Sequence, residues 1–214
     1  MTPLLALFDV DGTLLLTHDP LAGLALRETL AEQYGVELPE DAVDRVDHEG
    51  QTSLRIGRLV LTAAGVEEPK GLAQWCRDFA ERYVELLAAA DTGGWQAAPG
   101  AKPALGRLAA AGVRLALLTG NPEPMARARM ERLGFDRFFP RGHGAFGCES
   151  ESRVELIQLA RARAGGWPAQ ATVEIGDTDS DVASAAEAGI RSILVRGSGL
   201  AAAADQLIAW NRWP

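Results

Sequence analysis

Short apolar runs alternate along the chain with longer amphipathic stretches. Four of these runs end abruptly in a polar or glycine-bearing turn, which is typical of strands buried on both faces of a parallel sheet. They lie at residues 4–8, 113–118, 172–175 and 192–195. Helical stretches are predicted beside them at residues 103–111, 122–133, 152–164 and 179–188. This alternation predicts an α/β fold with a doubly wound, Rossmann-like parallel sheet, whose ligand crevice lies at the carboxyl ends of the strands.

The interval between the first two predicted strands is too long for a single helical connection. The first strand ends near Phe8 and the next begins near Val113, whereas a βαβ unit needs only about 30 residues. The intervening chain is predicted to be mostly helical, over residues 21–34, 52–64 and 72–90. We therefore expect an all-helical cap at residues 16–94, inserted into an α/β core made of residues 1–15 and 95–214. Residues 16–20 and 91–94 would be the paired hinges between them.

Local signals predict where two helices of the core lie. Ser152 and Glu155 have the S-x-x-E spacing of a capping box, in which the serine caps the third helical amide and the glutamate caps the serine amide. The alanine run at residues 201–204 predicts one more helix near the end of the chain.

Two carboxylates follow the first predicted strand directly. Asp9 and Asp11 are two positions apart in extended chain, so their side chains point to the same side and share one site. An ordinary acidic turn is the alternative interpretation. It is the weaker one, because like charges at the end of a buried strand are costly unless a cation or a proton compensates them.

Polar residues also follow the second and third predicted strands. Thr119, Gly120 and Asn121 stand before a helix, where a hydroxyl and free amides can hold a phosphoryl oxygen, although Thr-Gly-Asn is equally a common turn sequence. After the third strand come Asp177, Asp179 and Asp181, carboxylates of the kind that hard cations prefer. Asp177 is the better metal ligand, being nearest the strand end, whereas Asp179 at a helix start is better explained as a capping or solvated residue.

Composition narrows the class of protein. Acidic residues outnumber basic ones by 29 to 21, which gives a net charge of −8 and argues against nucleic acid or an anionic membrane as a partner. No stretch approaches the roughly 20 apolar residues that a membrane span requires. Cys76 and Cys148 form no metal-binding pattern and suggest no disulfide framework, so we expect a reducing, cytoplasmic location.

These clusters, taken in order, resemble the haloacid dehalogenase superfamily. The D-x-D-G-T of residues 9–13, the hydroxyl of Thr119 and the G-D-x-x-x-D of residues 176–181 match its phosphatases in sequence order and context. The helical insert resembles the cap of the phosphoglycolate-phosphatase and beta-phosphoglucomutase branch. The resemblance spans nearly the whole chain, and the ordered combination is far more specific than any single cluster.

The resemblance implies roles for individual residues and Mg²⁺ as the cofactor. Asp9 would be the nucleophile and a metal ligand, and Asp11 the general acid and then base, with its backbone carbonyl on the metal. Thr119 would bind the phosphoryl group, aided by Gly120 and Asn121. Asp177 would be the other protein ligand of the metal, and Asp181 would support that site.

One position departs from the family pattern. The family usually has a lysine between the second and third clusters, but the two lysines of this chain, Lys70 and Lys102, lie elsewhere. Arg153 is the candidate substitute, because it stands at a helix start and its fixed charge could hold Asp9 and the phosphoryl group. The alternative is an arginine merely solvated at the end of a helix.

The insert carries a candidate substrate loop. Residues 47–52 resemble the G-x-T specificity loop of capped phosphatases, so His48, Gly50 and Thr52 are predicted to contact the leaving group. A plain capping loop, with Thr52 as the N-cap of the next helix, is about as well supported. His18 in the first hinge is better explained as a solvated residue.

The sequence therefore predicts a Mg²⁺-dependent phosphatase acting on a small phosphorylated metabolite, with a phosphoglycolate-like substrate favoured, in a monomer or homodimer. A sugar-phosphate mutase of the same fold is one alternative. A catalytically silent module that binds a phosphorylated ligand is another, because the usual lysine is missing. Dehalogenase chemistry is disfavoured because it would not need Asp11 as a leaving-group acid. Phosphonate cleavage is disfavoured because Lys70, the one lysine of the insert, stands beside Pro69.

Overall fold

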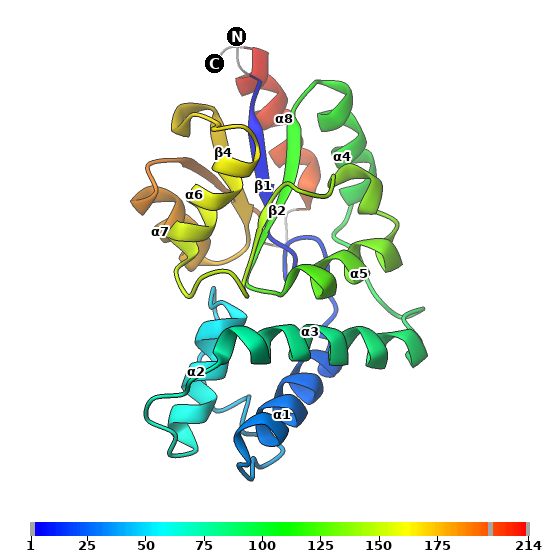
Figure 1. Cartoon of the computed structure of the whole chain (residues 1–214). Helices are drawn as coiled ribbons and strands as arrows, with labels where there is room; N and C mark the ends of the chain where they lie inside the picture. The colour runs from blue at the N-terminus through cyan, green and yellow to red at the C-terminus, as the bar shows by residue number, and fades with distance from the viewer. Residues whose placement is uncertain (1–2, 197–198, 213–214) are drawn as a thin grey trace.

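A five-stranded parallel sheet forms the centre of the larger part of the molecule (Figure 1). This computed structural model describes residues 3–196 and 199–212. The strands lie in the spatial order β3-β2-β1-β4-β5, so the first strand occupies the middle of the sheet. Their bounds are Leu5–Phe8 (β1), Arg114–Thr119 (β2), Ala145–Phe146 (β3), Thr172–Gly176 (β4) and Arg191–Leu194 (β5).

Helices cover both faces of the sheet. They are α4 (Ala101–Ala110), α5 (Glu123–Leu133), α6 (Arg153–Arg163), α7 (Asp179–Glu187) and α8 (Leu200–Arg212). Leu4, Ala6 and Phe8 belong to a buried cluster with α4, α5 and α8, whereas Leu5 and Leu7 belong to another with α6 and α7. Successive side chains of a strand point to opposite faces, so a strand that is apolar at every position requires a helical layer on each side. The predicted fold class is confirmed.

The helix starts differ in one respect from the prediction. Ser152 does cap α6, accepting a hydrogen bond from the Glu155 amide at 3.4 Å. The return bond is missing, because the Ser152 amide donates to Ser150 and the Glu155 carboxylate accepts from the Ser150 hydroxyl instead. The predicted capping box at Ser152 is therefore wrong, because the Ser150 hydroxyl accepts from the Ser152 amide and donates to Glu155, so these two groups do not bond to each other.

Three helices inserted between β1 and α4 form a cap at the carboxyl ends of the strands (Figure 1). They are α1 (Pro20–Tyr34), α2 (Ser53–Ala63) and α3 (Leu72–Ala89). The cap has its own buried core, in which the indole of Trp75 donates to the Thr29 hydroxyl at 3.0 Å and lies so close to Gly57 that a Cβ there would stand 2.4 Å from the ring. Met125 of α5 joins this core, so the cap packs directly on the α/β core.

The loop before α2 lies against the core at close range. The Ser53 amide donates to the Gly120 carbonyl at 2.8 Å, and the Leu54 amide donates to the Gly147 carbonyl at 3.1 Å. A Cβ on Gly147 would stand 1.7 Å from the Gly120 carbonyl oxygen, and one on Gly120 would stand 2.1 Å from the Gln51 carbonyl oxygen. Glycine at both positions is what allows three backbone segments to meet here.

A disulfide crosses the same boundary. Cys76, near the start of α3, is bonded to Cys148, which follows β3, with their Cα atoms 5.6 Å apart. The prediction that the two cysteines suggest no disulfide is wrong, because their 72-residue separation gave no sign that the fold brings the two segments together. Within residues 3–196 and 199–212, no helix is long and apolar enough to cross a membrane.

Candidate active site

The carboxyl ends of three neighbouring strands carry the polar clusters of the sequence. Asp9 follows β1, Thr119 ends β2, and Asp177 follows β4. Because β1 pairs with β2 on one side and with β4 on the other, all three residues lie at one edge of the sheet. That edge faces the cap across a cavity of about 860 Å³, whose lining includes Asp9, Asp11 and Thr119.

Carboxylates crowd one end of this cavity. Asp9, Asp177 and Asp181 each present an oxygen, and the three oxygens lie within 4.8 Å of one another. Thr13 donates to Asp177 at 2.9 Å, and a Cβ on Gly12, whose φ is +74°, would stand 2.1 Å from an Asp177 oxygen. Gly12 therefore lets the chain turn tightly around the Asp177 carboxylate.

Burial, and to a smaller extent the neighbouring carboxylates, raises the pKa values of Asp9 and Asp177. Burial raises the pKa of Asp9 well above its ordinary value, the Arg153 cation opposes the shift, and the Asp181 carboxylate adds to it. Burial also raises the pKa of Asp177. Both effects favour a compensating positive charge, and three convergent carboxylates suit a hard divalent cation. The Asp181 oxygens are partly engaged already, one by the Thr178 amide and hydroxyl and the other by Arg153, so Asp9 and Asp177 are the freer ligands.

Arg153 lies beside Asp9 and lines the cavity. Its side chain is only 7% exposed, which excludes the alternative of a solvated arginine at a helix end. One guanidinium nitrogen lies 3.4 Å from Asp9, 3.2 Å from Glu174 and in ion-pair contact with Asp181. Burial lowers the pKa of Arg153, but the Asp9 and Glu174 carboxylates outweigh that effect and raise it.

Glu174 is a member of this cluster that sequence analysis missed. It lies fully buried in β4, accepts a hydrogen bond from the Arg153 Nε at 3.2 Å and another from the Ser184 hydroxyl at 3.4 Å. Burial raises the pKa of Glu174 to about 7, and the Arg153 cation opposes the shift. The available signal was a charged residue inside an otherwise apolar strand, which is rarely buried without a partner.

Asp11 lines the cavity but is not one of the three clustered carboxylates. Its side chain is 52% exposed. The Arg129 guanidinium donates to both of its oxygens, at 2.8 and 2.9 Å, and the Asn121 amide donates to one of them at 2.5 Å. Asn121 also donates to the Thr119 hydroxyl at 3.0 Å. Arg129 is a second residue that sequence analysis missed, because nothing in the α5 sequence distinguishes it from that helix's other arginines.

The predicted substrate loop divides between two roles. His48, Gly50, Gln51 and Ser53 line the cavity. Thr52 does not appear in its lining; it is buried and caps α2 by accepting a hydrogen bond from the Arg55 amide at 3.3 Å. The structure thus favours the capping interpretation of Thr52.

His48 and Gly50 also contact other parts of the protein. The His48 Nε2 contacts the Val43 carbonyl at 2.5 Å within the cap. A Cβ on Gly50 would stand 2.0 Å from the Ser180 hydroxyl, so the loop reaches α7 of the core.

His18 also lines the cavity, from the first connection between core and cap. Asp179, at the start of α7, is exposed and pairs with Arg196, as the capping or solvated interpretation expected.

Comparison with known proteins decides the family. A family model of haloacid dehalogenase-like hydrolases matches residues 4–189. The chain belongs to this family. The resemblance drawn from the D-x-D-G-T and G-D-x-x-x-D clusters is therefore confirmed.

Individual relatives refine the placement within the family. The phosphoglycolate phosphatase of Rhodospirillum rubrum is 33% identical over 200 residues, which cover 90% of this chain and 79% of that protein. The tyrosine-protein kinase PtkA of Mycobacterium tuberculosis is 30% identical over 199 residues, and the match covers 91% of this chain but 62% of that protein.

Solved structures share the fold. The CbbY structure from Rhodobacter sphaeroides, in complex with phosphate, has a TM-score of 0.63 and 24% identity, covering 90% of this chain and 86% of that one. The beta-phosphoglucomutase of Clostridium difficile covers both chains completely, with a TM-score of 0.69 and 13% identity. Both are similar to this chain in fold, cap included.

Proposed function

We propose that this haloacid dehalogenase-like hydrolase is a Mg²⁺-dependent phosphatase that hydrolyses a small phosphomonoester through an aspartyl phosphate on Asp9. The observation that carries the proposal is the convergence of Asp9, Thr119, Arg153 and Asp177 at one edge of the sheet, under a cap. A carboxylate can attack a phosphoester only where positive charge offsets the repulsion between the two anions.

The donor set fits a magnesium ion. Asp9 and Asp177 would hold it, with support from Asp181 and the backbone carbonyl of Asp11. When bound, Mg²⁺ neutralises charge on the transferring phosphoryl oxygens. Burial raises the pKa values of Asp9 and Asp177, and a cation bound between them would favour the ionised forms of both carboxylates.

Asp9, Asp11 and Arg153 would carry out the remaining steps of the reaction. Asp9 forms a bond to phosphorus while the ester bond breaks, and Asp11 gives a proton to the leaving alkoxide. Asp11 then takes a proton from a water molecule that attacks the phosphorus of the aspartyl phosphate, which frees Asp9 and releases phosphate. Arg153 holds the Asp9 carboxylate, and its Nη2 forms ion pairs but no well-oriented hydrogen bond within the described residues. That nitrogen can serve a phosphoryl oxygen.

A phosphoglycolate-like substrate is the best supported choice. The relative from Rhodospirillum rubrum is a phosphoglycolate phosphatase. Arg27, on the cap helix α1, lines the cavity, and a guanidinium there suits a leaving group that carries a carboxylate. A mutase would have to retain a phosphorylated intermediate, and no specific contact in the cavity favours that alternative.

Phosphate release tests the proposal. The purified chain should release inorganic phosphate from 2-phosphoglycolate and from an aryl phosphate when Mg²⁺ is present, and chelation should abolish both reactions. Conversion of a sugar phosphate into its isomer without phosphate release would favour the mutase. Binding of phosphorylated ligands without any turnover would favour the silent module.

A further inference from the structure

We infer that Arg129 is the positioning residue for Asp11, and that it makes the orientation of Asp11 depend on the docked cap. The inference rests on the proposed function, because it assigns Asp11 the role of acid and base. Arg129 projects from α5 of the core and is only 2% exposed. It lies outside the sequence clusters that identify the family.

All three guanidinium nitrogens of Arg129 are engaged. Nη1 donates to both Asp11 oxygens, Nη2 donates to Asp19 at 3.0 Å, and Nε donates to the Tyr83 hydroxyl at 3.0 Å. The Tyr83 hydroxyl in turn donates to Asp19 at 2.5 Å, which closes the network. Burial lowers the pKa of Arg129, but its Asp11 and Tyr83 partners outweigh that effect and raise it, so the group stays charged.

Asp11 needs such a support. Its side chain is half exposed, so packing does not fix its direction, and a proton donor must lie within hydrogen-bond reach of the leaving oxygen. Its side-chain partners in the described part of the chain are Arg129 and Asn121. Of these, Arg129 is the buried and charged one, and its planar fork fixes an angle as well as a distance.

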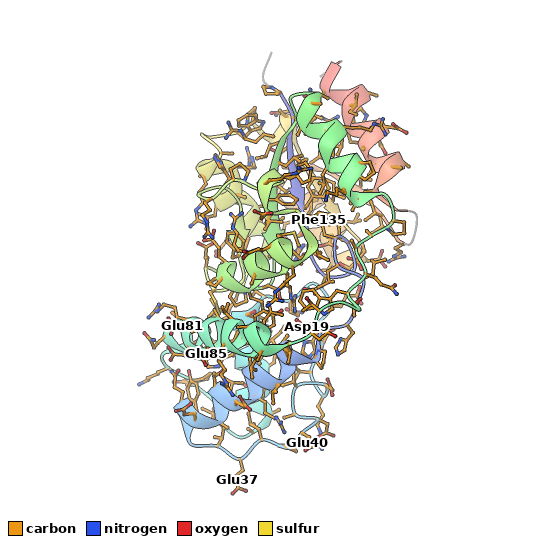
Figure 2. All side chains as sticks on the ribbon, turned by 90° about the vertical axis from the view of Figure 1, so that its right-hand side faces the viewer. Asp19, Glu37, Glu40, Glu81, Glu85 and Phe135 are labelled. Carbon is orange, nitrogen blue, oxygen red and sulfur yellow. A yellow bond between two sulfur atoms is a disulfide. The ribbon has the colours of Figure 1, made fainter. Side chains whose placement is uncertain are left out.

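The other partners of Arg129 belong to the cap. Tyr83 lies on α3, and Asp19 caps α1 by accepting from the Leu21 amide at 3.1 Å. Figure 2 shows Asp19 at the level where the cap helices meet the core. One arginine of the core therefore contacts the catalytic loop, one cap helix and the start of another. If the cap moves away, Arg129 loses two of its three partners, and the orientation of Asp11 loses its support.

The experiment compares two esters in one set of variants. An alkyl phosphate such as 2-phosphoglycolate needs a proton for its leaving oxygen, whereas p-nitrophenyl phosphate has a leaving group that departs unaided. The value of kcat/KM reports steps up to the first irreversible one, so it isolates the departure of the leaving group. Arg129→Met should lower kcat/KM about 10²-fold for the alkyl ester and less than about 10-fold for the aryl ester.

Controls separate positioning from folding. Arg132→Met removes another arginine that joins α5 to the cap, through the Leu87 carbonyl, and should leave the ratio of the two esters unchanged. Tyr83→Phe removes one hydroxyl and keeps the ring, and should shift the ratio in the same direction as Arg129→Met by a smaller factor. In an Asp11→Asn background, Arg129→Met should have no further effect on the alkyl ester.

Each outcome has a fixed meaning. Equal losses on both esters for Arg129→Met and Tyr83→Phe, or no loss on either, would overturn the inference. A further loss in the Asp11→Asn background would also overturn it, because Arg129 would then act elsewhere. A wild-type chain that hydrolyses neither ester would instead overturn the proposed function, and this inference with it.

A different observation carries a second inference: we propose that the Cys76–Cys148 disulfide is a redox-sensitive latch on the cap. Cys76 lies in the first half of α3, whereas the helix leaves the cap at Ala89, about 20 Å farther along at 1.5 Å per residue. The bond therefore joins cap and core at the end of α3 away from the connection at residues 90–95. A cap fixed at both ends cannot swing about that connection.

Reduction leaves weaker contacts at the latched side. They include the backbone bonds from Ser53 and Leu54 to core carbonyls and the bond from the Ser53 hydroxyl to the Gly120 carbonyl. They also include the ion pairs of Arg58 and Arg55 with Glu151, at 2.6 and 3.7 Å. Such contacts break and reform without covalent chemistry. A dithiol reductant would convert the disulfide into two thiols and would itself become a disulfide, so two electrons and two protons are transferred to the protein.

Hydrogen exchange tests the latch directly. Reducing the wild-type chain with dithiothreitol, to two titratable thiols, should speed amide exchange at Ser53 and Leu54 at least tenfold. The Cys76→Ser/Cys148→Ser variant should exchange at the reduced rate with or without the reductant. Unchanged exchange on full reduction, or two free thiols in the protein after air oxidation, would overturn the proposal.

Discussion

At the scale of single residues, the contacts of Arg153 and Glu174 support the proposal that an arginine replaces the usual lysine beside Asp9, the proposed nucleophile. A guanidinium carries five donors, which is more than Asp9 and a phosphoryl group can use. Glu174 accepts a hydrogen bond from Nε and also contacts Nη2, which in addition forms ion pairs with Asp181 and Asp9. The buried carboxylates therefore take up the extra donors and hold the guanidinium beside Asp9. Sequence analysis identified Arg153 from its place between two clusters, but the contribution of Glu174 depends on a contact between β4 and α6.

Substitution of Arg153 tests its role. Arg153→Ala should lower turnover by about 10² to 10³, because one preorganised charge contact is lost. Arg153→Lys should recover part of the loss, since the ammonium restores the charge without the fork. Steady-state hydrolysis of the aryl phosphate measures both. An alanine variant as active as the wild type would remove Arg153 from the catalytic machinery.

Glu174 should make stability depend on pH. Its pKa of about 7 in the folded chain exceeds the ordinary 4.5, so the folded state holds a proton that the unfolded state has released. The free energy of unfolding should therefore fall as pH rises from about 4.5 to about 7, by at most about 1.4 kcal/mol per pH unit for this one proton. Urea unfolding in the presence of chelator, wild type against Glu174→Gln, measures the difference. Parallel pH profiles for the two proteins would contradict it.

Substrate preference should depend on the cap side of the cavity. Arg27→Ala should lower kcat/KM for 2-phosphoglycolate about tenfold or more and should leave kcat/KM for the aryl phosphate nearly unchanged. Only 2-phosphoglycolate has a carboxylate that Arg27 could contact. His48→Ala tests the loop in the same way. Thr52→Ala is the comparison, since a capping residue should lower stability by about 1 kcal/mol without changing preference. Equal factors for both substrates in the first two variants would place specificity elsewhere.

At the scale of elements, the close backbone contact at Gly147 determines how the cap docks. Any Cβ there would collide with the Gly120 carbonyl, which accepts the bond from Ser53. Gly147→Ala should therefore destabilise the protein by roughly 1 to 3 kcal/mol, the usual cost of forcing atoms into a packed site. Gly106→Ala, in the middle of α4 where a Cβ meets nothing within 4 Å, should instead stabilise by about 0.5 to 1 kcal/mol. The thermal unfolding midpoints of both variants test this prediction. Equal shifts of the two midpoints from the wild-type value would contradict it.

The predicted elements match those of the structure to within one or two residues where periodicity was strong. Each of the four apolar runs became a strand. The expectation of burial on both faces is wrong for the last of them, because β5 is an edge strand that is only partly buried and its Leu194 is exposed. The short strand β3, at Ala145–Phe146, was missed because two residues are too few to show a hydrophobic pattern. The capping box that the sequence suggested at Ser152 occurs instead at Thr178 and Asp181, where both reciprocal bonds are present.

At the scale of the whole molecule, the sequence predicted that the polar clusters after β1, β2 and β4 would meet, because parallel strands bring their carboxyl ends to one edge of the sheet. It could not predict the contacts that join cap to core. Arg129 with Tyr83, and Cys76 with Cys148, meet only after α3 has packed on α5 and the core. Those contacts depend on helix orientation, which neither spacing nor composition encodes locally.

The central claim, that Asp9 forms a phosphorylated intermediate, has a direct measurement. Asp11→Asn is mixed with excess p-nitrophenyl phosphate and Mg²⁺, quenched in acid, and the mass of the peptide containing Asp9 is determined. The leaving group departs without the acid, but hydrolysis of the intermediate lacks its base, so the peptide should carry one added phosphoryl group that hydroxylamine removes. The adduct should be missing in Asp9→Asn. An Asp9 peptide without added mass while the aryl alcohol is released in a burst, or an adduct on another residue, would contradict the account.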